Sequence, residues 1–155
     1  MAGIDGLAGG YRVDEAVPVA WDHTWPPGEP SPGAGLLTLF RKRPDIDYAT
    51  FIERWHNGHT PLSLRVHPLC CYVRNVVREQ VVSGECWYDG IVEEHTPTRA
   101  DLVNPFRFFG GPLTIVGHML EVYRDVKGFI DYGSIQTYLV REYHFVDERR
   151  VHCDD

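Results

Sequence analysis

Side chains that carry or share protons near neutral pH recur in this chain at the ends of predicted strands and helices. An imidazole exchanges its proton near neutral pH, and a neighbouring carboxylate or phenol can orient the ring or share that proton. His59 follows Asn57-Gly58 at the end of a predicted helix, and the other groups lie in predicted strands. We expect a general acid–base site whose catalytic candidates are His59, Tyr72, Glu93, His95 and His144.

Each catalytic candidate also has a purely structural interpretation. His59 can cap a broken helix through a backbone hydrogen bond, and Tyr72 can be a core ring. Glu93 facing a buried pocket would be costly unless it were paired, so it is either functional or an edge residue in water. His95 and His144 lie at strand ends, where side chains are commonly exposed to solvent.

Aromatic and amide side chains near these candidates are expected to line a substrate pocket. Trp55 lies on an apolar helical stripe, so it is a core residue, a pocket wall or both. Tyr72 and Asn75 would each offer a hydrogen bond to a developing enolate oxygen, but strand alternation puts them on opposite faces and only one can do so. The other substrate-binding candidates are Phe106, Phe109, Trp25 and His118. The alternative for His118 is a structural role on a helix face, where its ring nitrogens find hydrogen-bond partners.

The elements that position these residues follow the order β-α-β-β-α-β. Apolar and β-branched runs predict strands over 36–40, 70–77, 90–95 and 136–146. A helix over about 48–57 ends at Asn57-Gly58, a shorter one over 61–66 restarts at Thr60-Pro61, and His59 lies in the break. A later helical region opens at Thr98 and resumes over 113–124. This order is typical of an α+β fold with a ferredoxin-like split βαβ sheet.

The predicted topology determines which chain ends meet. The first helix runs back along the first strand, so its C-terminal end comes to the sheet edge where the third and fourth strands end. We therefore expect His59 to lie near Tyr72, near Glu93 or His95, and near Glu142 or His144.

Glycine and proline are concentrated in the first 35 residues, where they occupy 12 positions. We therefore divide the chain into an N-terminal extension over 1–35 and a domain over 36–155. Residues 11–15 match residues 138–142 at three of five positions, which is interpreted as a coincidence, with an extra strand over 11–17 as the alternative. Trp21, His23 and Trp25 can close over the pocket as a lid, although a loose leader is the alternative.

Charge and composition exclude several classes of protein. The net charge is −7, from 15 basic and 22 acidic residues, and an acidic chain repels nucleic acid. No segment is apolar and long enough to span a membrane, and the N-terminus does not read as a secretory signal, so we expect a cytoplasmic location.

The cysteines and histidines do not predict a metal site. The four cysteines are interpreted as reduced thiols, because adjacent Cys70 and Cys71 bridge poorly. His56 and His59 have a metal-site spacing only on a continuous helix, which Gly58 and Pro61 argue against; a metal site that includes the two cysteines is the less favoured alternative.

Three stretches of the chain resemble the EthD family of the dimeric α+β barrel superfamily. They are Phe40-Arg-Lys-Arg-Pro44, the Phe51-to-Leu62 stretch with Trp55, His59 and Pro61, and Tyr72-Val-Arg-Asn-Val76. Tyr88 to Glu93 is similar to the family's third strand, and Glu142 lies in its last. The likeness covers residues 36–146, and its specific part is the tryptophan–histidine–proline spacing.

The resemblance implies a homodimer in which two ferredoxin-like sheets pack face to face, with a pocket near His59 in each subunit. The apolar run Leu36–Phe40 agrees with this, because it lacks the alternation of a half-exposed strand. Relatives in the superfamily include cofactor-free cyclases, dehydratases, decarboxylases and lactone isomerases, as well as monooxygenases and haem-handling enzymes. The fold alone does not fix the reaction.

The leading functional hypothesis is a cofactor-independent lyase or isomerase acting on a small, mostly apolar, oxygenated substrate such as an aromatic, a lactone or a polyketide. His59 would be the general base or acid, with Glu93 as its partner. One alternative is a non-catalytic ligand-binding protein that assists an oxygenase pathway. The other is a haem- or oxygen-using monooxygenase. The leading hypothesis requires no metal and no cofactor.

Overall fold

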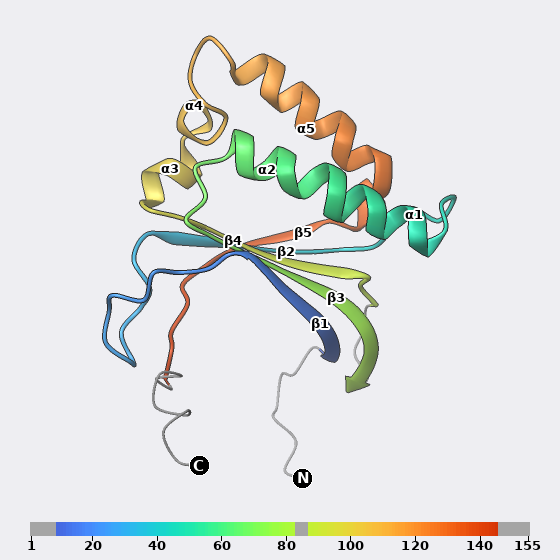
Figure 1. Cartoon of the computed structure of the whole chain (residues 1–155), viewed down its shortest axis with the longest axis horizontal. Helices are drawn as coiled ribbons and strands as arrows, with labels where there is room; N and C mark the ends of the chain where they lie inside the picture. Colours follow the sequence, from blue (N-terminus) through green and yellow to red (C-terminus); the bar gives the residue numbers. More distant parts are fainter. Residues whose placement is uncertain (1–8, 83–86, 146–155) are drawn as a thin grey trace.

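A computed structural model describes residues 9–82 and 87–145 as one sheet with helices packed on one of its faces (Figure 1). All neighbouring strands are antiparallel, and their spatial order is β1-β3-β4-β2-β5. The strands are β1 (Gly10–Val19), β2 (Ala34–Phe40), β3 (Cys71–Val82), β4 (Gly90–Thr96) and β5 (Gln136–Val140).

The predicted α+β class is confirmed, and the sheet is compatible with a ferredoxin-like fold. Strands β2 to β5 lie in the order β5-β2-β4-β3, and β1 pairs with β3 at the edge of the sheet. The last strand is shorter than predicted, because it ends at Val140. Ser83-Gly84 predicts a turn ahead of the strand over 90–95, and these two residues lie outside the described part of the chain.

The helices form a second layer over what we call the helix face of the sheet. α1 and α2 run along this face beside α5 (Figure 1). The helices are α1 (Tyr48–Glu53), α2 (Thr60–Val66), α3 (Arg99–Val103), α4 (Pro105–Phe108) and α5 (Ile115–Phe129). Within the described part of the chain, none of these helices combines the length and apolar character needed to span a lipid bilayer.

The predicted break before His59 is wrong, because the chain stays helical from α1 into α2. Residues Arg54–His59 form a π-helical stretch, η1, in which the Thr60 N–H donates to the Trp55 carbonyl five residues earlier. Gly58 does not adopt the left-handed conformation that would end a helix. The wider π turn takes up one extra residue without a break. His59 and Ser63 therefore lie about one turn apart on the same side of the helix.

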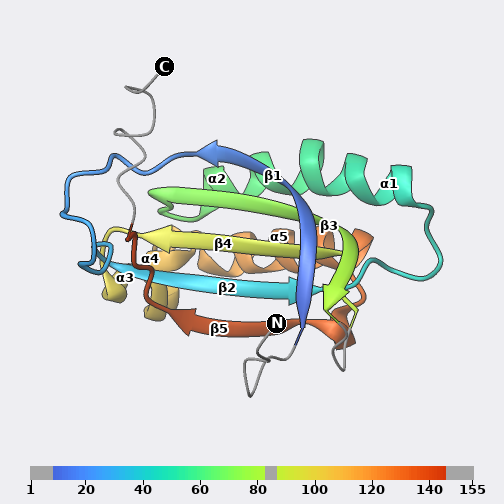
Figure 2. The same ribbon diagram turned by 90° about the horizontal axis from the view of Figure 1, so that it is seen from below.

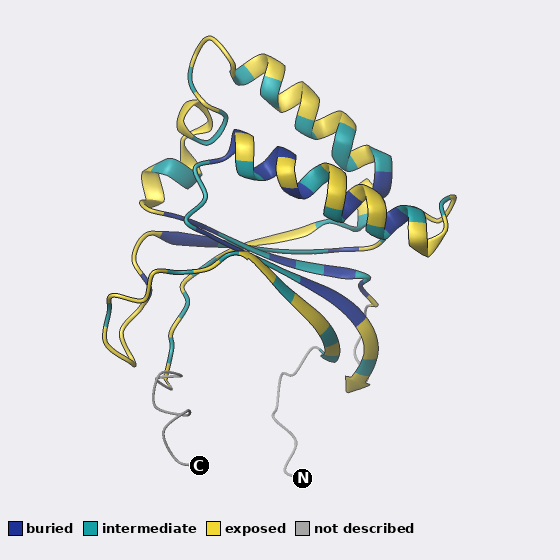
Figure 3. Cartoon of the chain, viewed as in Figure 1, coloured by how far each residue is buried: buried dark blue, intermediate teal, exposed yellow. Residues whose placement is uncertain are grey.

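Aromatic rings fill the core between the sheet and the helices. Phe51, Trp55, Tyr72 and Phe129 are fully buried there (Figure 3). Gly90 of β4 allows this packing, because a Cβ at that position would lie 2.7 Å from Cη2 of Trp55. The core therefore holds the first half of the helix that starts at Tyr48 against the sheet.

Among residues 9–82 and 87–145, no helix lies on the opposite face of the sheet, which we call the open face. β1 and the second half of β3 curl beneath it at one end (Figure 2). Residues 20–33, which we call the strap, cross its other end. The strap is tied to the chain after β5, because the backbone N–H of Ser31 donates to the carbonyl of Glu142 at 2.9 Å and Pro30 bridges to Tyr143.

Candidate functional site

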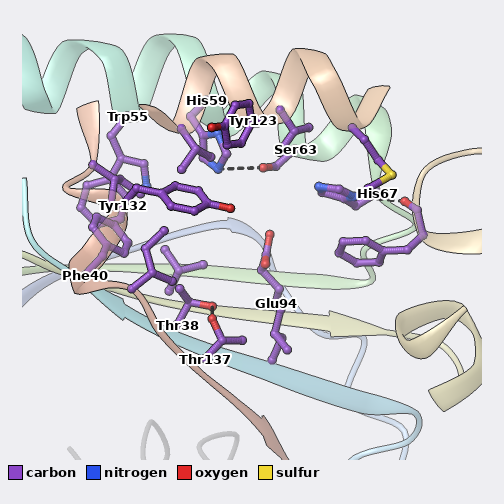
Figure 4. Close-up of a pocket in the computed structure, with 18 of the residues that line it drawn as sticks. Thr38, Phe40, Trp55, His59, Ser63, His67, Glu94, Tyr123, Tyr132 and Thr137 are labelled. Carbon is purple, nitrogen blue, oxygen red and sulfur yellow. Dashed lines mark hydrogen bonds between the residues drawn. The ribbon is translucent and has the colours of Figure 1, made fainter. Parts of the chain in front are cut away.

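A cavity of about 360 Å³ lies between the helix face and the helices (Figure 4). Its walls are mostly apolar, as in sites for small ligands. Met119 and Tyr123 of α5 line the cavity and are also exposed, so the cavity opens to solvent beside that helix. The ionisable and nucleophilic groups in its walls are His59, Ser63, His67, Glu94, Tyr123 and Tyr132.

His59 is held between two hydrogen-bonding partners. Its Nδ1 lies 2.7 Å from Oδ2 of Asp125 on α5, and its Nε2 lies 3.1 Å from Oγ of Ser63. The Asp125 carboxylate accepts the Nδ1–H, which leaves the Nε2 lone pair to accept the Ser63 hydroxyl. The imidazole is mostly buried, with 13% of its side chain exposed. This chain of contacts holds the ring in one tautomer with a basic nitrogen at the cavity wall.

Glu94 extends from β4 into the cavity toward His59 and Ser63 (Figure 4). Within the described part of the chain no side chain hydrogen-bonds to its carboxyl group. Burial raises the pKa of Glu94, and the nearby His59 lowers it by a smaller amount. A carboxyl group in such an environment retains its proton at higher pH and can act as a general acid.

His67 gives the cavity a neutral imidazole. Its Nδ1–H donates to the carbonyl of Phe108 at 3.0 Å, and its ring stacks on the Phe108 ring at 4.0 Å. Burial lowers the pKa of His67 to about 4, and the hydrogen bond to Phe108 only partly offsets this. At neutral pH, Nε2 of His67 is therefore a hydrogen-bond acceptor in the cavity wall.

The lowered pKa of His67 should make the fold less stable in mild acid. The unfolded chain protonates this residue below its ordinary pKa of 6.5, whereas the folded chain does so only near pH 4. The unfolded state therefore binds more protons in this window, and stability falls as the pH falls. Relative to His67→Asn, the wild type should lose about 2 to 3 kcal/mol of unfolding free energy between pH 7 and 4. Urea denaturation across this range measures the difference, and parallel curves for the two proteins would contradict the assignment.

Three of the predicted catalytic residues lie on the other side of the sheet. Glu93, His95 and His144 are on or beside the open face, so the predicted proximity of His59 to these groups is wrong. The reason is strand alternation, because it is Glu94 of β4 that faces the helices. Asp125 takes the position beside His59 that the sequence analysis gave to Glu93.

The predicted enolate-binding pair is divided between the two faces of the sheet, as alternation required. Tyr72 lies in the core on the helix face and is absent from the cavity wall. Burial, followed by the charge of Glu94, raises the pKa of Tyr72, which therefore stays protonated. Asn75 lies on the open face, where its amide donates to Oε1 of Glu93 at 3.1 Å.

The predicted substrate-binding residues are also divided. Trp55 and Phe109 line the cavity. Phe106 is half exposed on α4, outside the cavity wall, and His118 donates from Nδ1 to the Phe109 carbonyl at 2.8 Å rather than facing the cavity. Trp25 packs on His23 beside the open face, so the lid hypothesis does not apply to the His59 cavity.

Several residues of the site were missed by sequence reasoning. Those in the cavity wall are Ser63, His67, Glu94, Tyr123 and Tyr132, and Asp125 lies outside the wall and binds His59. Ser63 stands four residues after His59, a spacing that puts both on one helix face once the helix is known to be continuous. Asp125 had no local signal, because it is 66 residues from His59 in the chain.

Comparison with known proteins identifies no family for this chain. No protein-family model matches the sequence, and no curated protein matches it either.

Proposed function

We propose that the chain is a cofactor-independent lyase or isomerase that moves protons on a small, mostly apolar, oxygenated substrate. The observation that carries this proposal is an imidazole, His59, fixed by Asp125 and facing Glu94 across an apolar cavity. A basic nitrogen and a carboxyl group of raised pKa in one pocket are the parts that general acid–base catalysis needs.

The proposed reaction begins with proton abstraction next to a carbonyl group. Nε2 of His59 takes the proton, and the electron pair of the broken C–H bond passes to the carbonyl oxygen to give an enolate. Asp125 stabilises the imidazolium that forms. Protonated Glu94 then donates its proton to one of three acceptors. Protonation of another carbon of a conjugated enolate gives isomerisation, protonation of a leaving group gives elimination, and protonation of a second carbonyl oxygen that the enolate carbon attacks gives cyclisation. Each proton removed by one group is thus matched by a proton supplied by the other.

The cavity favours a substrate with one or two rings. Its volume of about 360 Å³ is at the lower end of the range for small-molecule sites. Most wall residues from α4, α5 and β2 are aromatic or aliphatic, and hydroxyl groups in the wall, besides that of Ser63, come from Thr38, Tyr123, Tyr132 and Thr137. Aromatic ketones, lactones and short polyketide-like β-dicarbonyl compounds fit this lining.

Proton exchange tests the proposal directly. The purified protein, with no added cofactor, is incubated in D₂O with a panel of enolisable aromatic ketones, lactones and β-dicarbonyls, and exchange is followed by NMR. We expect at least one class to exchange its α-proton faster than in buffer, and faster than with Glu94→Gln. Binding without exchange would favour the ligand-binding accessory protein, and a Soret band in the purified protein would favour the haem enzyme. Either result, or no binding at all, would overturn the proposal.

We also propose that the chain is an EthD-like subunit that forms a dimeric α+β barrel through its open face. In support, the open face has half-buried apolar side chains at Leu37, Leu39, Val73 and Ile91, which a second sheet would cover. Sedimentation should give twice the 17.7 kDa mass of the chain. Leu39→Lys should give the single mass, whereas Val116→Lys on the outer side of α5 should not, and a monomeric wild type would contradict the dimer.

A further inference from the structure

A second polar cluster lies across the sheet from the cavity, between the open face and the strap. It consists of Glu93 and His95 of β4 and Glu142 after β5. One ligand atom from each residue lies within 4.8 Å of the other two. The sheet separates this cluster from His59, so the proposed acid–base reaction makes no use of it.

His95 is the buried member of the cluster. Only 2% of its surface is exposed, and its Nδ1 has no hydrogen-bond partner among the described residues. Its Nε2 lies 3.5 Å from Oε2 of Glu142, a long contact for a hydrogen bond. Donor atoms around a tetrahedral ion with bonds of 2.0–2.1 Å lie about 3.3 to 3.4 Å apart, so the observed spacing is close to that of two ligands of one ion.

Gly35 of β2 makes the space that the His95 ring occupies. A Cβ at this position would lie 2.6 Å from Cε1 and 2.9 Å from Nδ1 of His95. Any larger residue would push the imidazole out of its place. The buried position of the His95 ring therefore depends on the glycine opposite it in the sheet.

Each carboxylate of the cluster is oriented by an outer hydrogen bond. The Asn75 amide donates to Oε1 of Glu93 at 3.1 Å, and the Trp21 indole N–H of the strap donates to Oε2 of Glu142 at 2.8 Å. The Trp21 ring also packs edge-on against His95 at 5.1 Å. Outer-shell hydrogen bonds of this kind hold ligand side chains in place at metal sites.

The carboxylates of Glu93 and Glu142 lie close together, so a positive charge between them would relieve their repulsion. His144 contributes a contact of 2.8 Å from Nε2 to Oε1 of Glu142, outside hydrogen-bond geometry, and its Nδ1 lies 3.1 Å from Nε2 of His23. A divalent cation would neutralise both carboxylates at once.

We propose that Glu93, His95 and Glu142 bind one divalent first-row transition-metal ion beneath the strap. Mixed imidazole and carboxylate donors suit zinc, iron, cobalt or manganese better than calcium or copper(I). Three protein ligands leave at least one coordination position for water or another ligand. No metal was expected from the sequence, because the three ligands come from two strand ends that are separated by more than 40 residues.

Metal titration of the untagged, EDTA-treated protein tests the site. Isothermal titration should give one bound Zn²⁺ per chain, and Co²⁺ should give the d–d absorption bands of a low-coordinate ion with nitrogen and oxygen ligands. Glu93→Gln and Glu142→Gln should each weaken Zn²⁺ binding at least about tenfold. Glu94→Gln is the matched control, because the same substitution at the next residue of β4 faces the other side of the sheet and should leave the affinity unchanged.

Three results would overturn the proposal. They are an absence of 1:1 binding in the wild type, equal binding by the Glu93→Gln/Glu142→Gln double variant, and thiolate charge-transfer bands from Co²⁺, which would assign the ion to cysteine. The cobalt spectrum is measured on the wild type, so it decides the donor set even where a variant fails to fold. Gly35→Ala keeps all three donors but displaces His95, and it should also weaken binding.

Discussion

Replacing His59 with glutamine should slow proton exchange on an active substrate by at least about a hundredfold, the usual contribution of a general acid–base group. Glutamine can still hydrogen-bond to Asp125 and Ser63, but it has no nitrogen that takes up a proton at neutral pH. The loss should therefore fall on kcat and leave substrate binding within a few-fold of the wild type. Exchange rates by NMR in D₂O, with binding measured separately, distinguish these two effects.

The neighbours of His59 provide the controls. Asp125→Asn should reduce kcat less than the His59 substitution, because it leaves the imidazole in place but weakens its orientation. Ser63→Ala should have little effect, because a substrate proton replaces the hydroxyl at Nε2; a loss as large as that of His59→Gln would point to Ser63 as a nucleophile instead. His118→Gln, on α5 outside the cavity wall, should leave the rate unchanged.

Truncating Trp55 to alanine should destabilise the fold by about 3 to 5 kcal/mol, as expected for a large aromatic side chain removed from a core. Trp55 is fully buried and packs against Phe40 at 5.0 Å and Phe51 at 5.4 Å between ring centroids. Its Nε1 has no hydrogen-bond partner among the described residues, so the loss comes from packing. Trp55→Phe should therefore cost much less. Urea denaturation measures both changes.

Trp87 gives a matched comparison for Trp55. It is 40% exposed, so Trp87→Ala should cost less than about 1 kcal/mol. Similar losses for Trp55→Ala and Trp87→Ala would show that the ring cluster is not the main source of stability. Because Trp55 also lines the cavity, its removal should enlarge the substrate site as well.

Strands β2 to β5 could be predicted from sequence because each contains an apolar or β-branched run bounded by turn residues, whereas β1 was expected only from a likeness to the last strand. The positions of β2 and β4 follow from such runs, and the β-α-β-β-α-β order then restricts the pairing. The continuity of the helix from Tyr48 to Val66 was harder to predict. Gly58 and Pro61 are ordinary signals for ending and restarting a helix, and a π turn that absorbs an extra residue leaves no such signal.

The contents of the site were less predictable for two physical reasons. Glu93 and Glu94 are adjacent, so a shift of one residue in strand phase exchanges which carboxyl group faces the helices. The sequence pattern does not fix that phase when both residues are glutamate. Asp125 reaches His59 through the packing of α5 on η1, a tertiary contact that no local pattern records.

The π-helical stretch also sets the angular phase between the two halves of the helix from Tyr48 to Val66. Successive residues of a regular α-helix are rotated by about 100°, so the extra residue taken up by η1 turns everything after it by roughly that angle relative to an unbroken α-helix. With the phase as it is, Phe51 and Trp55 point into the core while His59 and Ser63 point toward the cavity. The same residues wound as a regular α-helix would carry His59 and Ser63 away from the cavity, whereas deleting one residue from 54–59 would remove the extra residue and keep the second half in its present phase. Regularity and function are thus opposed in this segment, and the irregular turn is what allows one helix to serve both the core and the site.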